Sequence, residues 1–138
     1  MMKRTPLKRK TPLRKASQKA KRIQERRMDV KWSKCIRAIR KCAMCGETNK
    51  QLHAHHLITR SRKCLRWKLE NGLCLCASCH KLGAESAHRN PHVFTMRLRE
   101  RYPDRWEWIR DNKATVGVRV DLDAVEAFLD SIMPKEGE

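Results

Sequence analysis

Two Cys-x-x-Cys sequences with a cluster of histidines between them constrain this chain more than any other feature. The first runs from Cys42 to Cys45, and the second runs from Cys76 to Cys79 and is followed at once by His80. Between them lies the stretch His53 to His56, which reads His-Ala-His-His. Two thiolates separated by two residues can face one ion from a tight turn, and structural zinc sites take four N or S ligands. The pattern predicts a metal-organised segment over residues 42–80.

Cys74 competes for a place in this ligand set, because it lies two residues before Cys76. On a strand it would share the face of Cys76, but it lacks the turn geometry of a Cys-x-x-Cys pair. We therefore predict that structural Zn²⁺ is bound by Cys42, Cys45, Cys76 and Cys79. The alternative is reduced buried thiols without a metal. Cys35 and Cys64 are interpreted as ordinary thiols.

The charge of the chain indicates a polyanionic partner. The 138 residues include 33 basic and 15 acidic residues, and the formal net charge is +18. Nucleic acid is favoured over a membrane, because no strongly amphipathic membrane helix accompanies this charge and no apolar run approaches the roughly 20 residues of a membrane span. A purely structural protein-interaction module does not account for such a charge. With an aromatic content of 5%, the core must be small, and a structural metal would help to stabilise it.

The N-terminal third of the chain is predicted to contain an arm and a helix. Residues 1–16 twice place two basic residues before Thr-Pro-Leu, which predicts a disordered basic arm, or alternatively a mere solubilising tail. Residues 17–41 are predicted to form a basic amphipathic helix that Ser17 caps. Its apolar face would contain Met28, Trp32, Cys35 or Ile36, and Ile39. Residues 1–41 hold 17 basic and 2 acidic residues, a net charge of +15.

Residues 42–90 are predicted to form the metal-binding core, and residues 91–138 a helical extension. In the core we expect strands at 51–58 and 72–76, a basic loop between them, and a helix from Cys79 towards His88. The extension is expected to contain two helices that meet near Pro103, a strand at 115–120, and a last helix after Asp121. Its acidic end either folds back on the basic helix or balances charge. Three tryptophans are interpreted as core anchors rather than base-stacking residues, namely Trp67, Trp106 and Trp108.

The histidines indicate a second, different metal site. With four thiolates assigned to zinc, His55, His56 and His80 remain for one divalent ion with open coordination positions. Such an ion can neutralise a phosphate and stabilise a leaving oxygen. A neutral histidine nearby can take a proton from water, because its ordinary pKa is about 6.5. The alternatives are that these histidines are core or capping residues, or that they belong to the zinc site.

The span from Cys42 to His80 resembles the HNH endonucleases of the ββα-metal, treble-clef class. It is most similar to small phage-encoded members with a basic N-terminal arm. The resemblance is carried by both Cys-x-x-Cys pairs and by His55, His56, Asn71 and His80. It implies a small α+β fold with a ββα-metal core. It further implies that His56 is the general base and that Asn71 orients it across the loop. A catalytic divalent ion (Mg²⁺, Mn²⁺, Ni²⁺ or Zn²⁺) would be bound by His55 and His80.

Two points of geometry are left open by the sequence. Adjacent strand residues point to opposite faces, so His55 and His56 can serve one site only if the strand ends or twists there. Many relatives have a third histidine ligand one turn after the Cys-His pair, where this chain has Ala84. The next candidate, His88, lies eight residues after His80, or about 12 Å along a straight helix. It can be a ligand only if residues 82–86 break the helix, and Glu85 is a further candidate.

We therefore expect a metal-dependent DNA endonuclease with little sequence specificity. It would act in the cytoplasm of a bacterial host cell, in phage recombination or DNA packaging, with a phage or host protein of those processes as partner. Phosphates would be bound by the arm, the basic helix and four cations of the loop: Arg60, Arg62, Lys63 and Arg66. The alternative function is that of a non-catalytic, zinc-stabilised nucleic-acid-binding accessory protein. His53 and His92 are interpreted as structural or surface residues.

Overall fold

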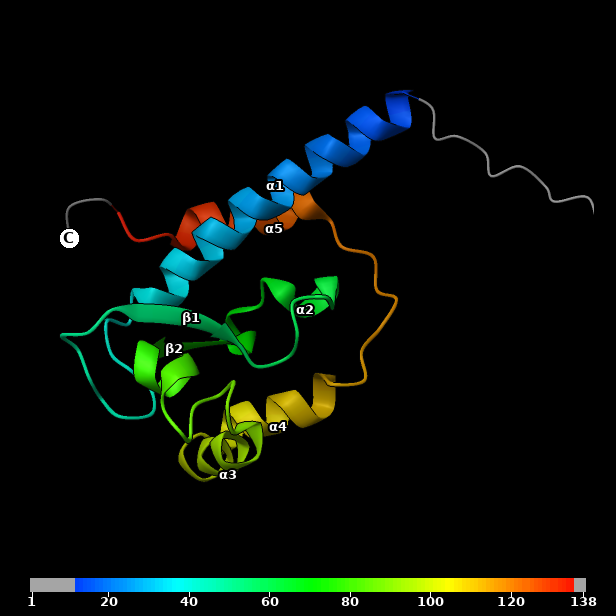
Figure 1. Ribbon diagram of the computed structural model, residues 1–138. Helices are drawn as coiled ribbons and strands as arrows, with labels where there is room; N and C mark the ends of the chain where they lie inside the picture. Colours follow the sequence, from blue (N-terminus) through cyan, green and yellow to red (C-terminus); the bar gives the residue numbers. More distant parts are fainter. Residues whose placement is uncertain (1–11, 136–138) are drawn as a thin grey trace, which may run out of the picture.

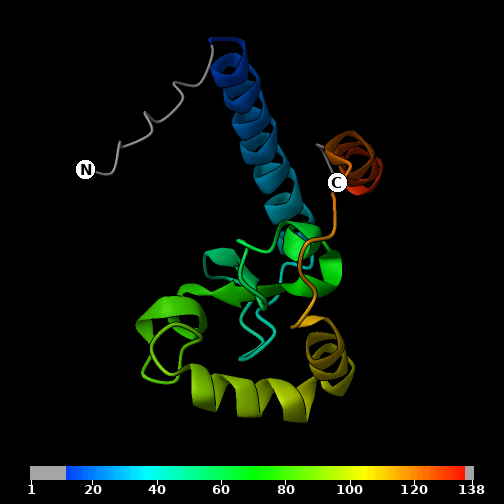
Figure 2. The same cartoon turned by 90° about the vertical axis from the view of Figure 1, so that its right-hand side faces the viewer.

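The computed structural model describes residues 12–135 and contains a two-stranded sheet at its centre (Figure 1). Strand β1 (Leu52–His56) pairs in antiparallel register with β2 (Gly72–Cys76), so that His56 lies opposite Gly72. Helix α1 (Pro12–Arg37) crosses one side of the sheet, whereas α3 (Pro91–Arg101) and α4 (Pro103–Asn112) lie on the other side (Figures 1 and 2). The arrangement confirms a small α+β protein.

The two faces of the sheet belong to two separate hydrophobic cores, because consecutive strand residues point to opposite sides. Leu73 and Leu75 pack with Phe94 and Leu98 of α3. Cys74 faces the other way, and it packs with three residues of α1, namely Met28, Trp32 and Ile36. Each core is therefore small, as the composition predicts.

Helix α1 begins earlier and ends earlier than the sequence predicts. It starts at Pro12 rather than at Ser17, and proline is tolerated there because the first N–H groups of a helix have no intrahelical acceptor. Residues 12–16 are thus helical, and the rest of the predicted arm, residues 1–11, lies outside the described residues. The apolar face is confirmed for Met28, Trp32 and Ile36. Ile39 was wrongly included, because it follows the end of the helix and is 64% exposed.

Helix α5 (Leu122–Ile132) lies against α1 and confirms that the acidic end folds back (Figure 1). Asp121 caps it by accepting a hydrogen bond from the Ala124 amide, as the position of this residue predicts. Glu126 accepts hydrogen bonds from Arg27 and Lys31 of α1. The two helices are therefore joined by opposite charges as well as by the apolar residues Met28 and Leu129.

Two predicted elements differ in the structure. Within residues 12–135 there is no strand at 115–120, because the valines at 116 and 118 face solvent and no neighbouring strand is available to pair with them. The predicted helix after Cys79 is only a π-helical segment, Ser78–Leu82. The loop between the strands contains α2 (Lys63–Arg66) and a 3₁₀ turn, Leu69–Asn71. No helix within the described residues is long and apolar enough to cross a membrane.

Candidate metal centres

Four cysteine sulphurs from two turns lie together at one end of the sheet. The sulphurs of Cys42, Cys45, Cys76 and Cys79 are all within 4.8 Å of one another, and those of Cys45 and Cys76 are 3.7 Å apart. A tetrahedral site with Zn–S bonds of about 2.3 Å holds neighbouring sulphurs about 3.8 Å apart. The cluster could therefore hold a structural metal such as zinc. The structure groups Cys76 and Cys79, and not Cys74, with the first pair, and Cys74 packs against α1 instead.

The local backbone and the electrostatics of this cluster both suit a cation. Gly46, with φ 75°, closes the turn after Cys45 by donating its amide to the Cys42 carbonyl at 2.9 Å. Burial raises the pKa of the Cys42 thiol, but hydrogen bonds from the backbone of Cys45, Cys76 and Met44 outweigh it and bring the pKa to about 7. Burial, followed by the contact with Cys76, raises the pKa of Cys79. Four thiolates in contact repel one another, and a divalent cation removes that repulsion.

Three imidazole rings form a second cluster, which we call the three-histidine cluster: His55, His80 and His88. One ring nitrogen of each lies within 4.8 Å of the others, and the two Nε2 atoms of His80 and His88 are 3.1 Å apart. Nitrogen ligands at about 2.1 Å from one ion are held about 3.0–3.4 Å apart. The spacing fits a divalent ion with three protein ligands. Because His88 is exposed, the cluster is open to solvent on that side.

His88 joins the cluster because the chain breaks after His80 and folds back. The π-helical segment ends at Leu82, and Gly83 takes an extended backbone conformation. The His88 amide then donates to the His80 carbonyl at 3.2 Å, which places the two residues side by side. His88 could be a ligand only if the helix broke at residues 82–86, and the structure has this break. Glu85, the other candidate, is exposed and lies 3.4 Å from Arg97 instead.

Two histidines of the cluster, His55 and His80, are held in the neutral form that metal binding requires. Burial, followed by the neighbouring charges of His80 and His88, lowers the pKa of His55 to about 3. Burial also lowers the pKa of His80 to about 4, again with a contribution from His88. Near pH 7 both rings therefore carry a free nitrogen lone pair.

His53 was interpreted as a structural or surface residue, but it contacts this cluster. Its Nδ1 lies 3.0 Å from Nδ1 of His80, so one of these nitrogens donates a hydrogen bond to the other. This contact engages Nδ1 of His80 and leaves its Nε2 directed at His88. Metal-binding histidines commonly have such a partner on the second nitrogen. The signal was available in the sequence, because His53 lies two residues before His55 and so shares its face of the strand.

His56, the last residue of β1, points to the opposite face from His55. Its ring stacks on Trp32 of α1, with centroids 4.0 Å apart, and its Nε2 lies 2.9 Å from the carbonyl oxygen of Arg66. A carbonyl only accepts, so Nε2 carries the proton and Nδ1 has the free lone pair. Burial lowers the pKa of His56 below its usual value, so the ring is neutral near pH 7. His55 and His56 nevertheless line the same hollow, because β1 ends there.

Comparisons of the chain with known protein families, with curated proteins and with solved structures find no match. The interpretation of the site therefore depends on its geometry. That geometry consists of a four-cysteine cluster, a three-histidine cluster, and a separate histidine with one free nitrogen. The two clusters lie towards opposite ends of the same small sheet, because Cys76 is at the end paired with Leu52, whereas His55 is near the end at Gly72.

Asn71 hydrogen-bonds to two parts of the loop, one of which lies next to the residue that contacts His56. It is fully buried, and its side chain accepts a hydrogen bond from the Ile58 amide at 2.6 Å. The same side chain donates to the carbonyls of Ile58 and Leu65 at 3.0 and 3.1 Å. It thereby ties together the start and the middle of the loop. The next residue after Leu65 is Arg66, whose carbonyl holds His56.

The four loop cations have different surroundings. Arg66 is 13% exposed and makes two hydrogen bonds to Asp29 of α1, at 2.9 and 2.5 Å. Lys63 pairs with Glu25 at 2.6 Å, and Arg62 donates to the Thr115 carbonyl. Arg60 is exposed and lines the same hollow as the histidines. Of the four, Arg60 is the cation placed nearest to that hollow, while the other three join segments of the protein.

Proposed function

We propose that this protein is a metal-dependent endonuclease that hydrolyses DNA phosphodiester bonds in the manner of HNH enzymes. One observation carries the proposal. Three imidazoles are spaced for one ion, and they share a hollow with His56, a histidine whose Nδ1 is free. A purely structural role would not require four histidines to line one hollow.

His56 would act as the general base. Its neutral Nδ1 would accept a proton from the water that attacks the phosphate, and Nε2–H would remain bonded to the Arg66 carbonyl as the ring becomes positive. Stacking on Trp32 fixes the ring orientation throughout. A divalent ion on the three-histidine cluster would stabilise the charge on the phosphate and the leaving oxygen. Asn71 would be a positioning residue, since it holds the loop and not the substrate.

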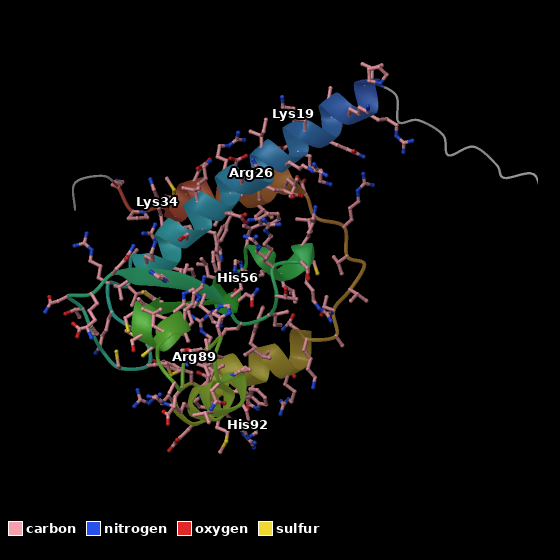
Figure 3. The ribbon with its side chains drawn as sticks, in the orientation of Figure 1. Lys19, Arg26, Lys34, His56, Arg89 and His92 are labelled. Atoms are coloured by element: carbon pink, nitrogen blue, oxygen red, sulfur yellow. The ribbon has the colours of Figure 1, made fainter. Side chains whose placement is uncertain are left out.

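Helix α1 supplies the surface for the DNA backbone. Residues 12–37 contain ten basic and two acidic residues, and both acidic ones, Glu25 and Asp29, are turned to the loop cations. Lys19, Arg26 and Lys34 follow one another along the exposed helix (Figure 3). Contacts of this kind are non-specific in sequence and weaken steeply with salt. Arg60 would continue this positive surface to the hollow.

Plasmid cleavage by His56→Ala tests the proposal. With Mg²⁺, Mn²⁺, Ni²⁺ or Zn²⁺, we expect the wild-type protein to nick or linearise the plasmid and the variant to lose about 10²-fold or more in rate. DNA affinity, measured by fluorescence anisotropy, should be unchanged. His92→Ala is the matched control, since His92 is an exposed histidine on α3 (Figure 3).

Two outcomes would contradict the endonuclease. If the wild-type protein binds DNA but cuts none under any of these ions, the non-catalytic binding protein is the better description. If His56→Ala cuts as fast as the wild type, the cleavage does not come from this site.

A further inference from the structure

The hollow beside the three-histidine cluster has two chemically different walls. Its volume is about 530 Å³. One wall carries the histidines and Arg60, and the other is formed by apolar side chains of α3 and α4, among them Phe94, Trp106 and Ile109. Phe94 also touches the ring of His55, at 5.6 Å between centroids, so the two walls meet at the ligand cluster itself. Whatever binds the cluster therefore also meets an aromatic surface.

The apolar wall is held in place but is left partly uncovered. None of the ten residues of α4 is buried, so Trp106 and Trp108 were wrongly interpreted as core anchors, and Trp106 and Ile109 remain partly exposed. The helix is nevertheless fixed, because Arg105 donates to the carbonyls of Leu69, Glu70 and Gly72 at 2.9, 2.7 and 3.0 Å. A fixed, partly exposed indole beside Arg60 and a cluster that could hold a cation is a surface for a ligand that has both a flat ring and an anionic group.

Unpaired DNA has both of these groups, and paired DNA does not present them together. In a duplex the base faces are stacked inside the helix, so a phosphate at the histidines would leave the apolar wall facing water. An unpaired nucleotide exposes its base, and stacking of a base on an aromatic side chain contributes about 1–3 kcal/mol. Arg99 lies over one face of the Trp106 ring, with Cζ 6.0 Å from the centroid, so a base would stack on the opposite face of the indole, close to that positive charge.

We propose that this hollow binds an unpaired nucleotide next to the cleaved phosphate, with its base stacked on Trp106. The preferred substrate is then single-stranded DNA or an unpaired segment within a duplex. This inference rests on the proposed endonuclease function for the cleaved bond, and it adds the substrate class.

Trp106→Ala, with Trp108→Ala as the matched control, tests the inference. Both tryptophans are partly exposed on α4, but only Trp106 lines the hollow. With Mn²⁺, we expect the wild type to cut a single-stranded oligonucleotide at least tenfold faster than the same sequence as a duplex. Trp106→Ala should lose about tenfold in kcat/KM on the single strand, whereas its duplex cleavage and Trp108→Ala should stay near wild type. Trp106→Phe should recover most of the loss.

A substrate without bases separates stacking from a change in folding. In an oligonucleotide built from stable abasic residues, the wild type and Trp106→Ala should be cut at the same reduced rate. If single strand and duplex are cut equally fast, or if Trp106→Ala slows both alike, the inference is overturned and the endonuclease stands. If no DNA is cut at all, fluorescence anisotropy with the labelled single strand still tests whether the hollow binds a nucleotide. Weaker binding by Trp106→Ala than by Trp108→Ala supports the nucleotide site, and equal binding overturns it.

Discussion

At the residue scale, the alternation of side chains along β1 decides what each histidine can do. His53 and His55 share the face towards His80, and His56 occupies the other face on Trp32. The sequence indicated His55, His56 and His80 through their clustering, and their roles came from the resemblance to HNH endonucleases. It did not predict His53, because its partner His80 comes from a segment whose position depends on how the strands pair. It left His88 conditional, because a break in the helix cannot be read from periodicity.

We predict that His53 positions His80 for metal binding. His53→Ala removes the hydrogen bond at Nδ1 of His80 and should lower the affinity for Co²⁺ about 10- to 100-fold. His53→Asn retains an amide that can bond to the same nitrogen and should lose less. Isothermal titration calorimetry and the visible absorption of bound Co²⁺ measure both. His92→Ala is the control, and equal Co²⁺ affinity in all four proteins would show that His53 has no such role.

At the element scale, the close approach of α1 to the sheet depends on one glycine. A Cβ on Gly72 would lie 2.6 Å from Cγ1 of Ile36 and 2.8 Å from Cζ2 of Trp32, which are both buried. We expect Gly72→Ala to lower the free energy of unfolding by about 1–3 kcal/mol. Because Trp32 stacks on His56, DNA cleavage should fall as well.

A second substitution checks this explanation. Ile36→Ala removes the side chain that the new methyl group would meet. The double variant should therefore lose less free energy of unfolding than the two single variants lose together. Urea unfolding measures the free energy of unfolding of the three variants. Plasmid nicking reports whether the ring of His56 is still correctly placed. Simple additivity of the two changes would mean that α1 does not press on Gly72.

The docking of α5 on α1 should depend on pH through Glu126. Hydrogen bonds from Arg27 and then Lys31 hold the pKa of this carboxyl well below its usual value of 4.5. A pKa that is lower in the folded than in the unfolded protein gives stability that is present above pH 4.5 and is lost as the pH falls below it. Glu126→Gln should therefore cost about 1–2 kcal/mol at pH 7, and the difference from wild type should shrink in acid.

Thermal unfolding of both proteins between pH 7 and pH 3.5 measures this difference. Protonation of the cysteines in acid affects both proteins equally and therefore cancels. Glu107→Gln changes an exposed acid of α4 and should match the wild type throughout. A gap between wild type and Glu126→Gln that stays constant with pH would show that the ion pairs do not hold α5.

The elements were predictable where a local rule decides them. Pro103 begins α4, and Asp121 caps α5. Strand β2 was predicted with its full bounds, residues 72–76, because the chain is continuously apolar there and lies between two packed layers. Residues 115–120 have the alternation of a strand, but a strand also needs a neighbour, and that neighbour depends on the whole fold.

At the scale of the whole molecule, the protein has two small cores on the two faces of a two-stranded sheet. A sheet of this size has little stability of its own. The four-cysteine cluster joins the turn after α1 to the end of β2, so it connects two segments of different parts of the chain. The three-histidine cluster reaches the surface, because His88 is exposed, and the backbone already joins His88 to His80. The two clusters should therefore contribute unequally to folding.

We predict that loss of the structural metal unfolds the protein, whereas loss of the second ion does not. Cys45 and His88 are both exposed ligands, which makes Cys45→Ala and His88→Ala a matched pair. Cys45→Ala should lower Tm by about 10 °C or more, because a structural zinc contributes directly to folding. His88→Ala should change Tm by only a few degrees and abolish cleavage. Circular dichroism, zinc content and plasmid nicking distinguish the two, and an unchanged Tm for Cys45→Ala would mean that packing alone holds the turns around the sheet.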